Sequence, residues 1–506
     1  MYSVVESVGL AGLSGFAVSV ETDIGGGLPA FETVGLPDAA VRESRERVRA
    51  AVKNSSLTFP TARITVNLSP ADKRKEGSLY DLPIAASLLI ASGQLPQSAA
   101  DGAVILGELS LDGLVRPVNG VLPMVIEAHA RGRSRFFVPA ANAEEAACVP
   151  DIDVYPVESL KAFSAHLRGS APIAKAEPRP WTRESLRYAS DFSEIRGQKG
   201  AKRATEVAVA GGHNLLLIGT PGSGKTMLAR SIPSILPELT YEEALEITKI
   251  HSVSGVLSGG LVAERPFRAP HHGASAAALI GGGARALPGE ISLAHFGVLF
   301  LDELPEYQRS VLEALRQPLE DGFVTISRAA ATSTYPAEFI LVAAMNPCPC
   351  GNYGSRINVC RCTPTAIERY RAKLSGPLLD RIDLQIEMPE VDYDALSGKP
   401  DGEPSSAVRA RVNAAREIQR KRFENCGIFT NAQMDAKQIR TYCAPTGRAE
   451  LLLKQAYTRY RLSARAYNRI LKVARTVADL AGSPEIQFEH YAEAIQYRSL
   501  DLGERE

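Results

Sequence analysis

The sequence predicts a multidomain α/β protein, with an N-terminal α+β domain, a central domain built on a parallel sheet, and a helical C-terminal domain. Its 506 residues are enough for about three domains. Three short and almost uninterrupted apolar runs, NLLLIG, GVLFLDE and FILVAAMNP, each precede a loop in the central region. Such runs are typical of strands that are buried on both faces of a parallel sheet.

The N-terminal domain is expected over residues 1–168. Apolar residues alternate with others at positions 16, 18 and 20 and again at 64, 66 and 68, a period that indicates half-buried strands. Between them, Val41, Val48 and Val52 share one face of a predicted helix. Residues 169–190 begin with a stretch rich in Pro, Ala and Gly and are expected to form a linker. The central domain is then expected over 191–390 and the helical domain over 391–506.

The charge of the chain is balanced overall but unevenly distributed. Lys plus Arg and Asp plus Glu both number 57, which argues against a wholly basic protein that coats nucleic acid. Residues 401–475, however, hold 16 Lys or Arg against 6 Asp or Glu, which leaves 41 against 51 elsewhere. This basic segment is compatible with DNA contacts, and also with arginines that bind nucleotide phosphates or acidic groups of a neighbouring subunit.

We expect a cytoplasmic protein that does not enter the membrane. The N-terminal MYSVVESVGL has an acidic residue and no basic lead, unlike a secretory signal. The longest uncharged stretch near the front, residues 82–100, is too often interrupted by polar residues to span a bilayer. Seven cysteines without an export signal suggest a reducing compartment.

The nucleotide-binding motif GxxxxGK[ST] occurs in full between a predicted strand and a predicted helix. Backbone amides of such a loop curl around phosphates, and the dipole of the following helix favours the same anion. The Lys is expected to reach the β- and γ-phosphates of ATP and the Thr to ligate Mg²⁺. The motif consists of Gly219, Thr220, Pro221, Gly222, Ser223, Gly224, Lys225 and Thr226.

Two further strand ends carry polar residues that suit ATP hydrolysis. Asp302 and Glu303 follow an apolar strand, so Asp302 is expected to bind Mg²⁺ through water and Glu303 to polarise the attacking water. Asn346 ends the next apolar run and is expected to bond the water or the γ-phosphate.

Taken together, these motifs resemble the YifB/ComM family of magnesium-chelatase-like AAA+ ATPases. The resemblance covers about 300 residues and is carried by the loop above and by the segments RPFRAPHHGAS, PGEISLAHFGVLFLDELPE, LRQPLEDG, AAMNPCPCG, GPLLDRID and RILKVARTVADL. It implies an AAA+ P-loop core and a helical lid of the magnesium-chelatase C-terminal type.

The resemblance also assigns roles to particular arginines and histidines. It implies that Arg381 acts in trans on the γ-phosphate bound by a neighbouring subunit, although a salt bridge to an adjacent aspartate is the structural alternative. It points to Arg465 as the second nucleotide-sensing arginine, with Arg469 as the rival. His271 and His272 are expected to pack or to bond between subunits rather than to bind metal or catalyse.

Four cysteines form two closely spaced pairs in a loop over residues 348–362. The pairs are Cys348 with Cys350 and Cys360 with Cys362, and four thiolates in this arrangement suit tetrahedral Zn²⁺. Unliganded thiols and an iron–sulfur cluster are the alternatives. A bound zinc would brace a loop that starts directly after Asn346.

The N-terminal domain resembles the Lon-protease-like domain, which has the ribosomal-S5-like fold. Proteolysis of that type needs a Ser activated by a Lys, but Leu79 and Leu122 occupy the matching positions. Ser78 is adjacent, yet no lysine occurs between Lys75 and Lys161. We therefore expect a scaffold for oligomerisation or DNA contact.

The resemblance implies a ring, most simply a homo-hexamer, because a neighbour completes each site. A predicted hairpin over residues 322–336 would present Arg328 to single-stranded or branched DNA. The favoured function is an ATP-driven DNA helicase or branch-migration motor in natural transformation. The alternatives are a protein-remodelling or protease-linked ATPase and a metal-chelatase motor subunit.

Overall fold

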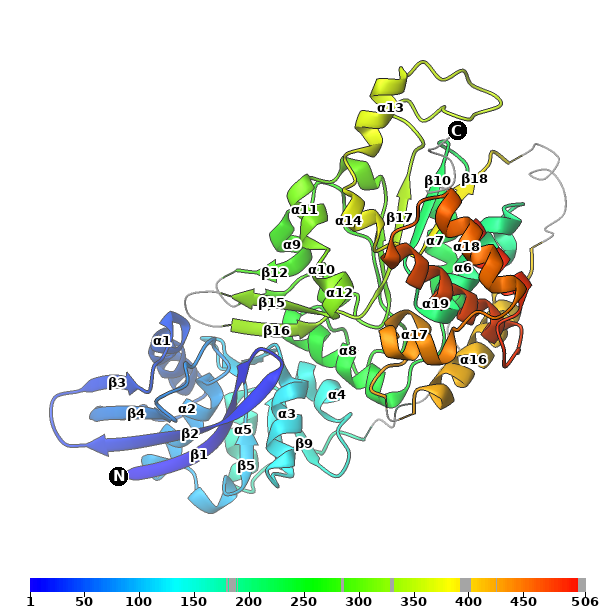
Figure 1. The fold of residues 1–506 in the computed structure, drawn as a ribbon. Helices are drawn as coiled ribbons and strands as arrows, with labels where there is room; N and C mark the ends of the chain where they lie inside the picture. Colours follow the sequence, from blue (N-terminus) through cyan, green and yellow to red (C-terminus); the bar gives the residue numbers. More distant parts are fainter. Residues whose placement is uncertain are drawn as a thin grey trace. The chain divides into compact units, whose positions relative to one another are not determined.

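A computed structural model describes residues 1–178, 181, 188, 190–283, 286–327, 332–391, 402–424 and 426–498 (Figure 1). The chain divides into two compact units. The first comprises residues 1–184 and 241–263, and the second comprises residues 185–240 and 264–506. Among the helices of the described residues, none is both long and apolar enough to cross a membrane.

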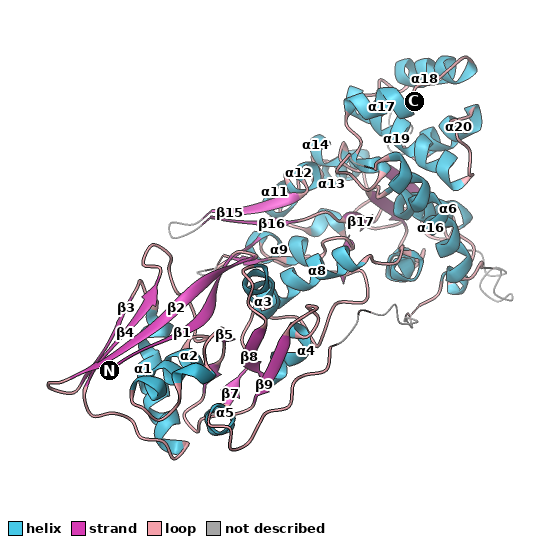
Figure 2. Ribbon diagram, turned by 90° about the horizontal axis from the view of Figure 1, so that it is seen from below, coloured by secondary structure: helices cyan, strands magenta, loops and turns pink. Residues whose placement is uncertain are grey.

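The first unit is built on a mixed seven-stranded sheet of order β3-β4-β2-β1-β5-β8-β9 (Figure 2). Strands β1, β2 and β4 pair antiparallel, whereas the other neighbours pair parallel. The alternation expected around positions 16–20 and 64–68 is confirmed, because these apolar side chains are buried on β2 and β4. The strands are β1 (Tyr2–Ala11), β2 (Ser14–Gly25), β3 (Ala30–Val34), β4 (Arg63–Ser69), β5 (Ala103–Ile105), β8 (Arg135–Pro139) and β9 (Asp153–Val157), with a small pair β6 (Glu108–Leu109) and β7 (Val115–Arg116).

Helices of the first unit pack on this sheet and on one another. Helix α2 (Asp81–Ala91) contacts β1, β2 and α1 (Ala39–Asn54), and all of its residues are buried. The predicted apolar face of α1, with Val41, Val48 and Val52, is confirmed as its buried face. The remaining helices are α3 (Val121–Ala130), α4 (Ala143–Ala146), α5 (Leu160–Leu167) and α8 (Tyr241–Ser254).

Helix α8 makes the first unit discontinuous in sequence. It packs on α3, and its Ser252 hydroxyl donates a hydrogen bond to the buried Glu145 carboxylate. The same carboxylate accepts from the backbone N–H of Leu122 at 2.8 Å, and burial raises its pKa. One buried acidic side chain thus ties α8 to two other segments of the unit.

The second unit is centred on a parallel five-stranded sheet of order β11-β14-β17-β10-β18. Its three inner strands are the three apolar runs of the sequence, and every residue of these strands is buried. Helix α6 (Lys199–Gly211) packs on β10 and β18 and is itself contacted by α16 (Ser405–Arg422) and α19 (Ala464–Leu480) (Figure 1). The strands are β10 (Leu215–Gly219), β11 (Phe267–Arg268), β14 (Val298–Leu301), β17 (Ile340–Met345) and β18 (Leu384–Met388).

A hairpin and several short helices complete this unit. The predicted hairpin is confirmed as β15 (Phe323–Ser327) paired antiparallel with β16 (Thr332–Pro336), but Arg328 lies outside the described residues. A second, minimal pair is β12 (Gly281–Gly282) with β13 (Leu287–Pro288). The helices are α7 (Lys225–Ser231), α9 (Ala276–Ile280), α10 (Glu290–Leu293), α11 (Arg309–Ala314), α12 (Pro318–Asp321), α13 (Pro364–Arg371) and α14 (Gly376–Leu379).

The C-terminal part is helical, as predicted. Two long helices, α16 (Ser405–Arg422) and α19 (Ala464–Leu480), bury their apolar faces. They are accompanied by α17 (Ala436–Tyr442), α18 (Arg448–Arg459) and α20 (Phe488–Gln496).

A buried histidine joins the start of the sheet to these helices. The Nε2 atom of His213, just before β10, lies 2.7 Å from the hydroxyl of Thr476 on α19, and its Nδ1 atom lies 3.9 Å from the Asp383 carboxylate. Burial lowers the pKa of His213 to about 4, although Asp383 acts in the opposite direction. His213 is therefore neutral in the native protein at pH 7.

We expect the free energy of unfolding of the second unit to decrease as the pH falls from 6.5 toward 4. The unfolded imidazole binds a proton with a pKa near 6.5, whereas native His213 stays neutral down to about 4, so acid favours the unfolded chain. The expected loss between pH 7.5 and 5.5 is about 1 kcal/mol. Urea unfolding of the wild type and of His213→Asn at both pH values measures it. An equal pH dependence in the two proteins would contradict the assignment.

Candidate nucleotide site and cysteine cluster

The Gly-rich loop connects β10 to α7 in the conformation that its sequence requires. Gly222 and Gly224 have φ angles of 81° and 91°, in the left-handed region that side chains disfavour. The Lys225 ammonium is folded back onto this loop and donates to the carbonyl oxygens of Gly219 at 2.7 Å and Thr220 at 2.9 Å. The carbonyl oxygens of the loop therefore hold the Lys225 ammonium in place.

The Thr226 hydroxyl donates a hydrogen bond of 2.8 Å to the Oδ2 atom of Asp302. These are the two side chains expected to hold Mg²⁺, one from α7 and the other from the end of β14. Asp302 also accepts a 3.0 Å hydrogen bond from the backbone N–H of Glu303. The Glu303 side chain itself is 55% exposed.

Asn346 lies between the Gly-rich loop after β10 and the acidic end of β14 because of the strand order. Strand β17, which it follows, is flanked by β10 on one side and β14 on the other. Its side-chain oxygen accepts a hydrogen bond of 3.3 Å from Lys225. Since the carboxyl ends of parallel strands meet at one edge, the sheet brings together Lys225, Thr226, Asp302 and Asn346.

The donors at this edge fit a nucleoside triphosphate with Mg²⁺. Burial lowers the pKa of Lys225, while Asp302 and Glu303 oppose that shift, so a cation is held in a low-dielectric loop beside two carboxylates. The buried hydroxyls of Thr220 and Ser223 have no hydrogen-bond partner among the described residues. When bound, the nucleotide would supply the phosphoanhydride bond, and Lys225 with the loop amides would hold its phosphates.

Gln198 is a site residue that sequence reasoning missed. Its side-chain amide donates to the carbonyl oxygen of Ser223 at 3.1 Å and to that of Pro389 at 2.6 Å. It therefore connects the Gly-rich loop to the segment that follows β18. The signal in the sequence was the Gly197–Gln198 pair immediately before the helix. In the structure, Gln198 adopts a left-handed φ of 51° just before α6.

The two histidines lie beside the acidic strand end. His272 Nδ1 is 3.6 Å from Glu303 Oε2, and the rings of His271 and His272 are 4.1 Å apart. The ring centres of Tyr307 and His272 are 6.5 Å apart, and burial raises the pKa of the Tyr307 phenol to about 12. His272 can thus orient the Glu303 carboxylate, and neither histidine belongs to a three-ligand cluster among the described residues.

Arg381 lies at the opposite edge of the sheet from the phosphate loop. It precedes β18, whose Leu384 pairs with Leu215 and whose Met388 pairs with Gly219. The five residues of that strand separate the two edges by about 16 Å. Arg381 is therefore too far from the Lys225 site of its own chain to contact a phosphate there.

The partners of Arg381 differ from the aspartates considered from sequence. Its guanidinium forms a salt bridge with Glu320 and donates to the carbonyl oxygen of Pro377 at 2.7 Å. The Glu320 side chain is 53% exposed, and Arg465 lies 3.7 Å from it. Glu320, Arg381 and Arg316 line an open cavity of about 350 Å³.

Arg469 is held inside the unit rather than presented at a phosphate site. It forms a salt bridge with the buried Asp383 and donates to the carbonyl oxygen of Arg381 at 3.0 Å. Arg465, by contrast, is 60% exposed. Arg465 lies beside Glu320, the partner of Arg381, so its role as the second nucleotide-sensing arginine stays a prediction.

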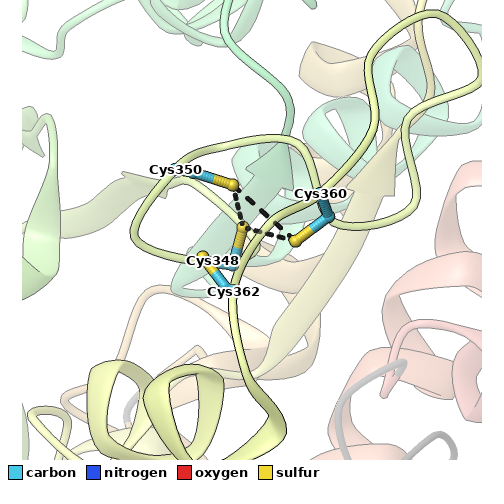
Figure 3. Close-up of side chains that lie close together, drawn as sticks. All are labelled: Cys348, Cys350, Cys360 and Cys362. Atoms are coloured by element: carbon cyan, nitrogen blue, oxygen red, sulfur yellow. Dashed lines mark hydrogen bonds between the residues drawn. The ribbon is translucent and has the colours of Figure 1, made fainter.

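The four cysteines gather at the base of one loop (Figure 3). The Sγ atom of Cys348 lies 3.4 Å from that of Cys350 and 3.8 Å from that of Cys360, and the latter two are 3.7 Å apart. Four thiolates at about 2.3 Å from a central Zn²⁺ would have sulfur–sulfur distances of about 3.8 Å. Backbone amides of Asn352 and Arg361 lower the pKa of Cys350 to about 6, which favours a thiolate. The cluster, completed by Cys362, could hold zinc.

Three family models match the chain in succession. The magnesium chelatase subunit ChlI model matches residues 191–396, a second ChlI model matches residues 20–142, and the ChlI C-terminal model matches residues 402–498. YifB of Escherichia coli is 45% identical over 99% of this chain and 97% of its own length. Competence protein ComM of Haemophilus influenzae is 44% identical over 98% of this chain and 97% of its own length.

The chain belongs to the YifB/ComM family of magnesium-chelatase-like ATPases. Membership implies an ATPase that uses ATP and Mg²⁺, in agreement with the site at the carboxyl edge of the sheet. A true chelatase component is more distant: the magnesium-chelatase 67 kDa subunit of Chlorobaculum parvum is 29% identical over 31% of this chain and 23% of that subunit.

In this YifB/ComM-family protein, Ser78 lies outside any arrangement that would make it a nucleophile. Its hydroxyl donates to the carboxylate of Glu108, and the positions expected for a Ser–Lys pair are the buried Leu79 and Leu122. Lys75, the nearest lysine in sequence, is buried and donates to the carbonyl oxygen of Pro70.

We expect about one zinc ion per chain, bound by the four cysteines. Cys348→Ser removes the buried ligand and should release the metal and lower the melting temperature. Cys426→Ser, at an exposed cysteine outside the cluster, is the matched control and should do neither. Elemental analysis and thermal melting are the measurements. Less than about 0.3 zinc per chain, with unchanged stability in Cys348→Ser, would rule out a structural zinc site.

Proposed function

We propose that this protein is a ring-forming, ATP-driven DNA motor that unwinds DNA or moves the branch point of recombination intermediates. The similarity to competence protein ComM over 97% of that protein supports a role in the processing of DNA during natural transformation. The five-stranded sheet and its site supply the motor, an AAA+ core that couples hydrolysis to movement.

The observation that carries the ring is the placement of Arg381. Its edge of the sheet is opposite to the edge that carries Lys225 and Asp302, so each chain has a phosphate site and a distant arginine. Copies arranged head to tail bring the arginine of one to the site of the next. A closed homo-oligomer, most simply a hexamer, uses both surfaces of every copy.

The basic C-terminal segment supports DNA binding less than its charge count suggested. Arg422 forms a salt bridge with Asp479, and Arg469 with Asp383. Arg411 is shared by Glu206 and Glu403. These arginines form ion pairs within the unit, whereas Arg420, Lys421 and Arg465 stay largely exposed, so only part of the basic excess is open to DNA.

A fluorescence assay with forked and four-way DNA, with and without ATP, tests the function. We expect ATP-dependent strand separation or branch migration and an ATPase rate that DNA stimulates. Lys225→Ala is expected to lose activity by at least about 100-fold while it keeps the fold, because it removes the loop cation. A wild-type protein without ATP-dependent remodelling and without DNA-stimulated ATPase would refute a DNA motor.

A further inference from the structure

The cysteine loop carries features that neither the nucleotide site nor the fold requires. Residues 347–373 contain five Lys or Arg and one acidic residue. Within them, residues 351–363 contain two arginines and no carboxylate. Arg356 and Arg361 are exposed on a loop that extends from the sheet before α13 (Figure 1).

The tip of this loop also exposes apolar side chains. Ile357 is 77% exposed, Val359 is 84% exposed and Tyr353 is 49% exposed. The guanidinium of Arg371 lies 5.8 Å from the centre of the Tyr353 ring. Aliphatic, aromatic and cationic groups are thus combined on one short segment.

The tip is an ordered turn held by hydrogen bonds. The Ser355 hydroxyl donates to the Glu390 carboxylate at 2.5 Å and accepts from the backbone N–H groups of Ile357 and Asn358 at 3.1 and 2.8 Å. Glu390 also accepts from the N–H of Arg356 at 3.0 Å. Apolar side chains fixed in solvent on a braced turn are suited to insertion into a partner, because little further ordering is needed.

We propose that the loop between Cys350 and Cys360 is a DNA-contacting element. Arg356 and Arg361 bind backbone phosphates, Tyr353 stacks on an unpaired base, and Ile357 with Val359 form a wedge against the base stack. Two arginines and no carboxylate in residues 351–363 favour an anionic partner such as the DNA backbone, and the Glu390 carboxylate at the turn is already bonded to Ser355 and to the N–H of Arg356. Stacking on aromatic rings and insertion of aliphatic wedges are general modes of DNA recognition.

The loop is also in contact with the nucleotide site. Gly351, at a φ of 81°, packs so closely on Pro221 of the Gly-rich loop that a Cβ atom there would lie 2.7 Å from the proline ring. The segment that carries the loop begins directly after Asn346. Lys373, which follows α13, lies 3.2 Å from Glu306, three residues after Glu303. A change at the phosphates can therefore move the tip, which would couple DNA contact to hydrolysis.

This inference rests on the proposed DNA motor, and the test separates the two. The variants Arg356→Glu/Arg361→Glu and Ile357→Ser/Val359→Ser are compared with the wild type and with two matched controls on exposed positions elsewhere in the unit, Arg420→Glu and Phe429→Ser. Binding of a fluorescent forked DNA is measured over a range of salt, together with ATPase without DNA and oligomer size.

Both loop variants are expected to bind DNA at least about 10-fold more weakly than the wild type, and the arginine variant should reduce the salt slope by about 1.5 for two lost phosphate contacts. ATPase without DNA, oligomer size and both controls should match the wild type. A photo-crosslinking residue at position 359 should form an adduct with DNA in the otherwise intact protein.

Unaltered DNA binding in both loop variants, with no crosslink, would overturn the inference and leave the motor standing. Loss of the oligomer in the loop variants, with a crosslink to a second copy, would instead make the loop a contact between subunits. A wild type that binds no DNA and has no DNA-stimulated ATPase would refute the motor itself.

Discussion

Arg381→Ala is expected to reduce the ATPase rate of the assembled protein by about 1,000-fold or more while ATP affinity remains close to that of the wild type. Arg381 lies at the sheet edge away from Lys225, so it would act on the nucleotide of a neighbouring copy. Glu320 is 53% exposed and keeps Arg465 at 3.7 Å after the substitution, so no carboxylate is left buried and unpaired. Phosphate release and nucleotide binding by the same preparation provide the two measurements.

Mixing two inactive variants distinguishes action in trans from a structural role. Arg381→Ala keeps an intact phosphate loop and Lys225→Ala keeps an intact arginine. In a random 1:1 ring, about a quarter of the interfaces would pair the two intact halves and recover activity. Arg420→Ala, at a side chain that is 66% exposed, is the control for the loss of an arginine elsewhere on the unit and should keep the wild-type ATPase rate. Absence of any recovery in rings shown to be mixed would contradict a role in trans.

Asp479→Ala is expected to destabilise the second unit by about 3–5 kcal/mol. The buried Asp479 carboxylate accepts hydrogen bonds from Arg422 at 2.7 and 2.5 Å and from Arg475 at 3.0 Å. It also accepts from the Asn431 amide at 2.8 Å. Its removal leaves the largely buried guanidinium groups of Arg422 and Arg475 without a counter-charge. The free energy of unfolding therefore falls by more than the net contribution of the ion pairs.

Urea or thermal unfolding of the Asp479 variant measures this loss. Glu417→Ala on α16 is the matched control, because its carboxylate pairs with Arg420 at 2.9 Å where both side chains are largely exposed. Its expected cost is below about 1 kcal/mol. Equal losses in the two variants would show that Asp479 does not neutralise buried charge.

The sequence predicted the elements of the nucleotide site because their signals are local. A continuous apolar run followed by a polar residue defines β10, β14 and β17 within a few residues. The motif ending in Lys225 and Thr226 carries its own loop geometry through its glycines. Alternation of apolar residues likewise defined β2 and β4.

The partners of charged side chains could not be predicted in this way. Arg381 pairs with Glu320, 61 residues earlier in the chain, rather than with a neighbouring aspartate. The basic excess of residues 401–475 is partly neutralised by Glu206, Asp383 and Asp479. A count of charges along the chain contains no information about which of them meet.

The sequence by itself therefore determined the element types, the phosphate loop, the acidic strand end and the grouping of cysteines in one loop. Only the tertiary structure decided that Asn346 contacts Lys225, that Arg381 lies at the far edge of the sheet, and that α8 belongs to the first unit. The physical reason is that periodicity and backbone preferences act over a few residues, whereas strand order and burial bring together residues that are distant in the chain.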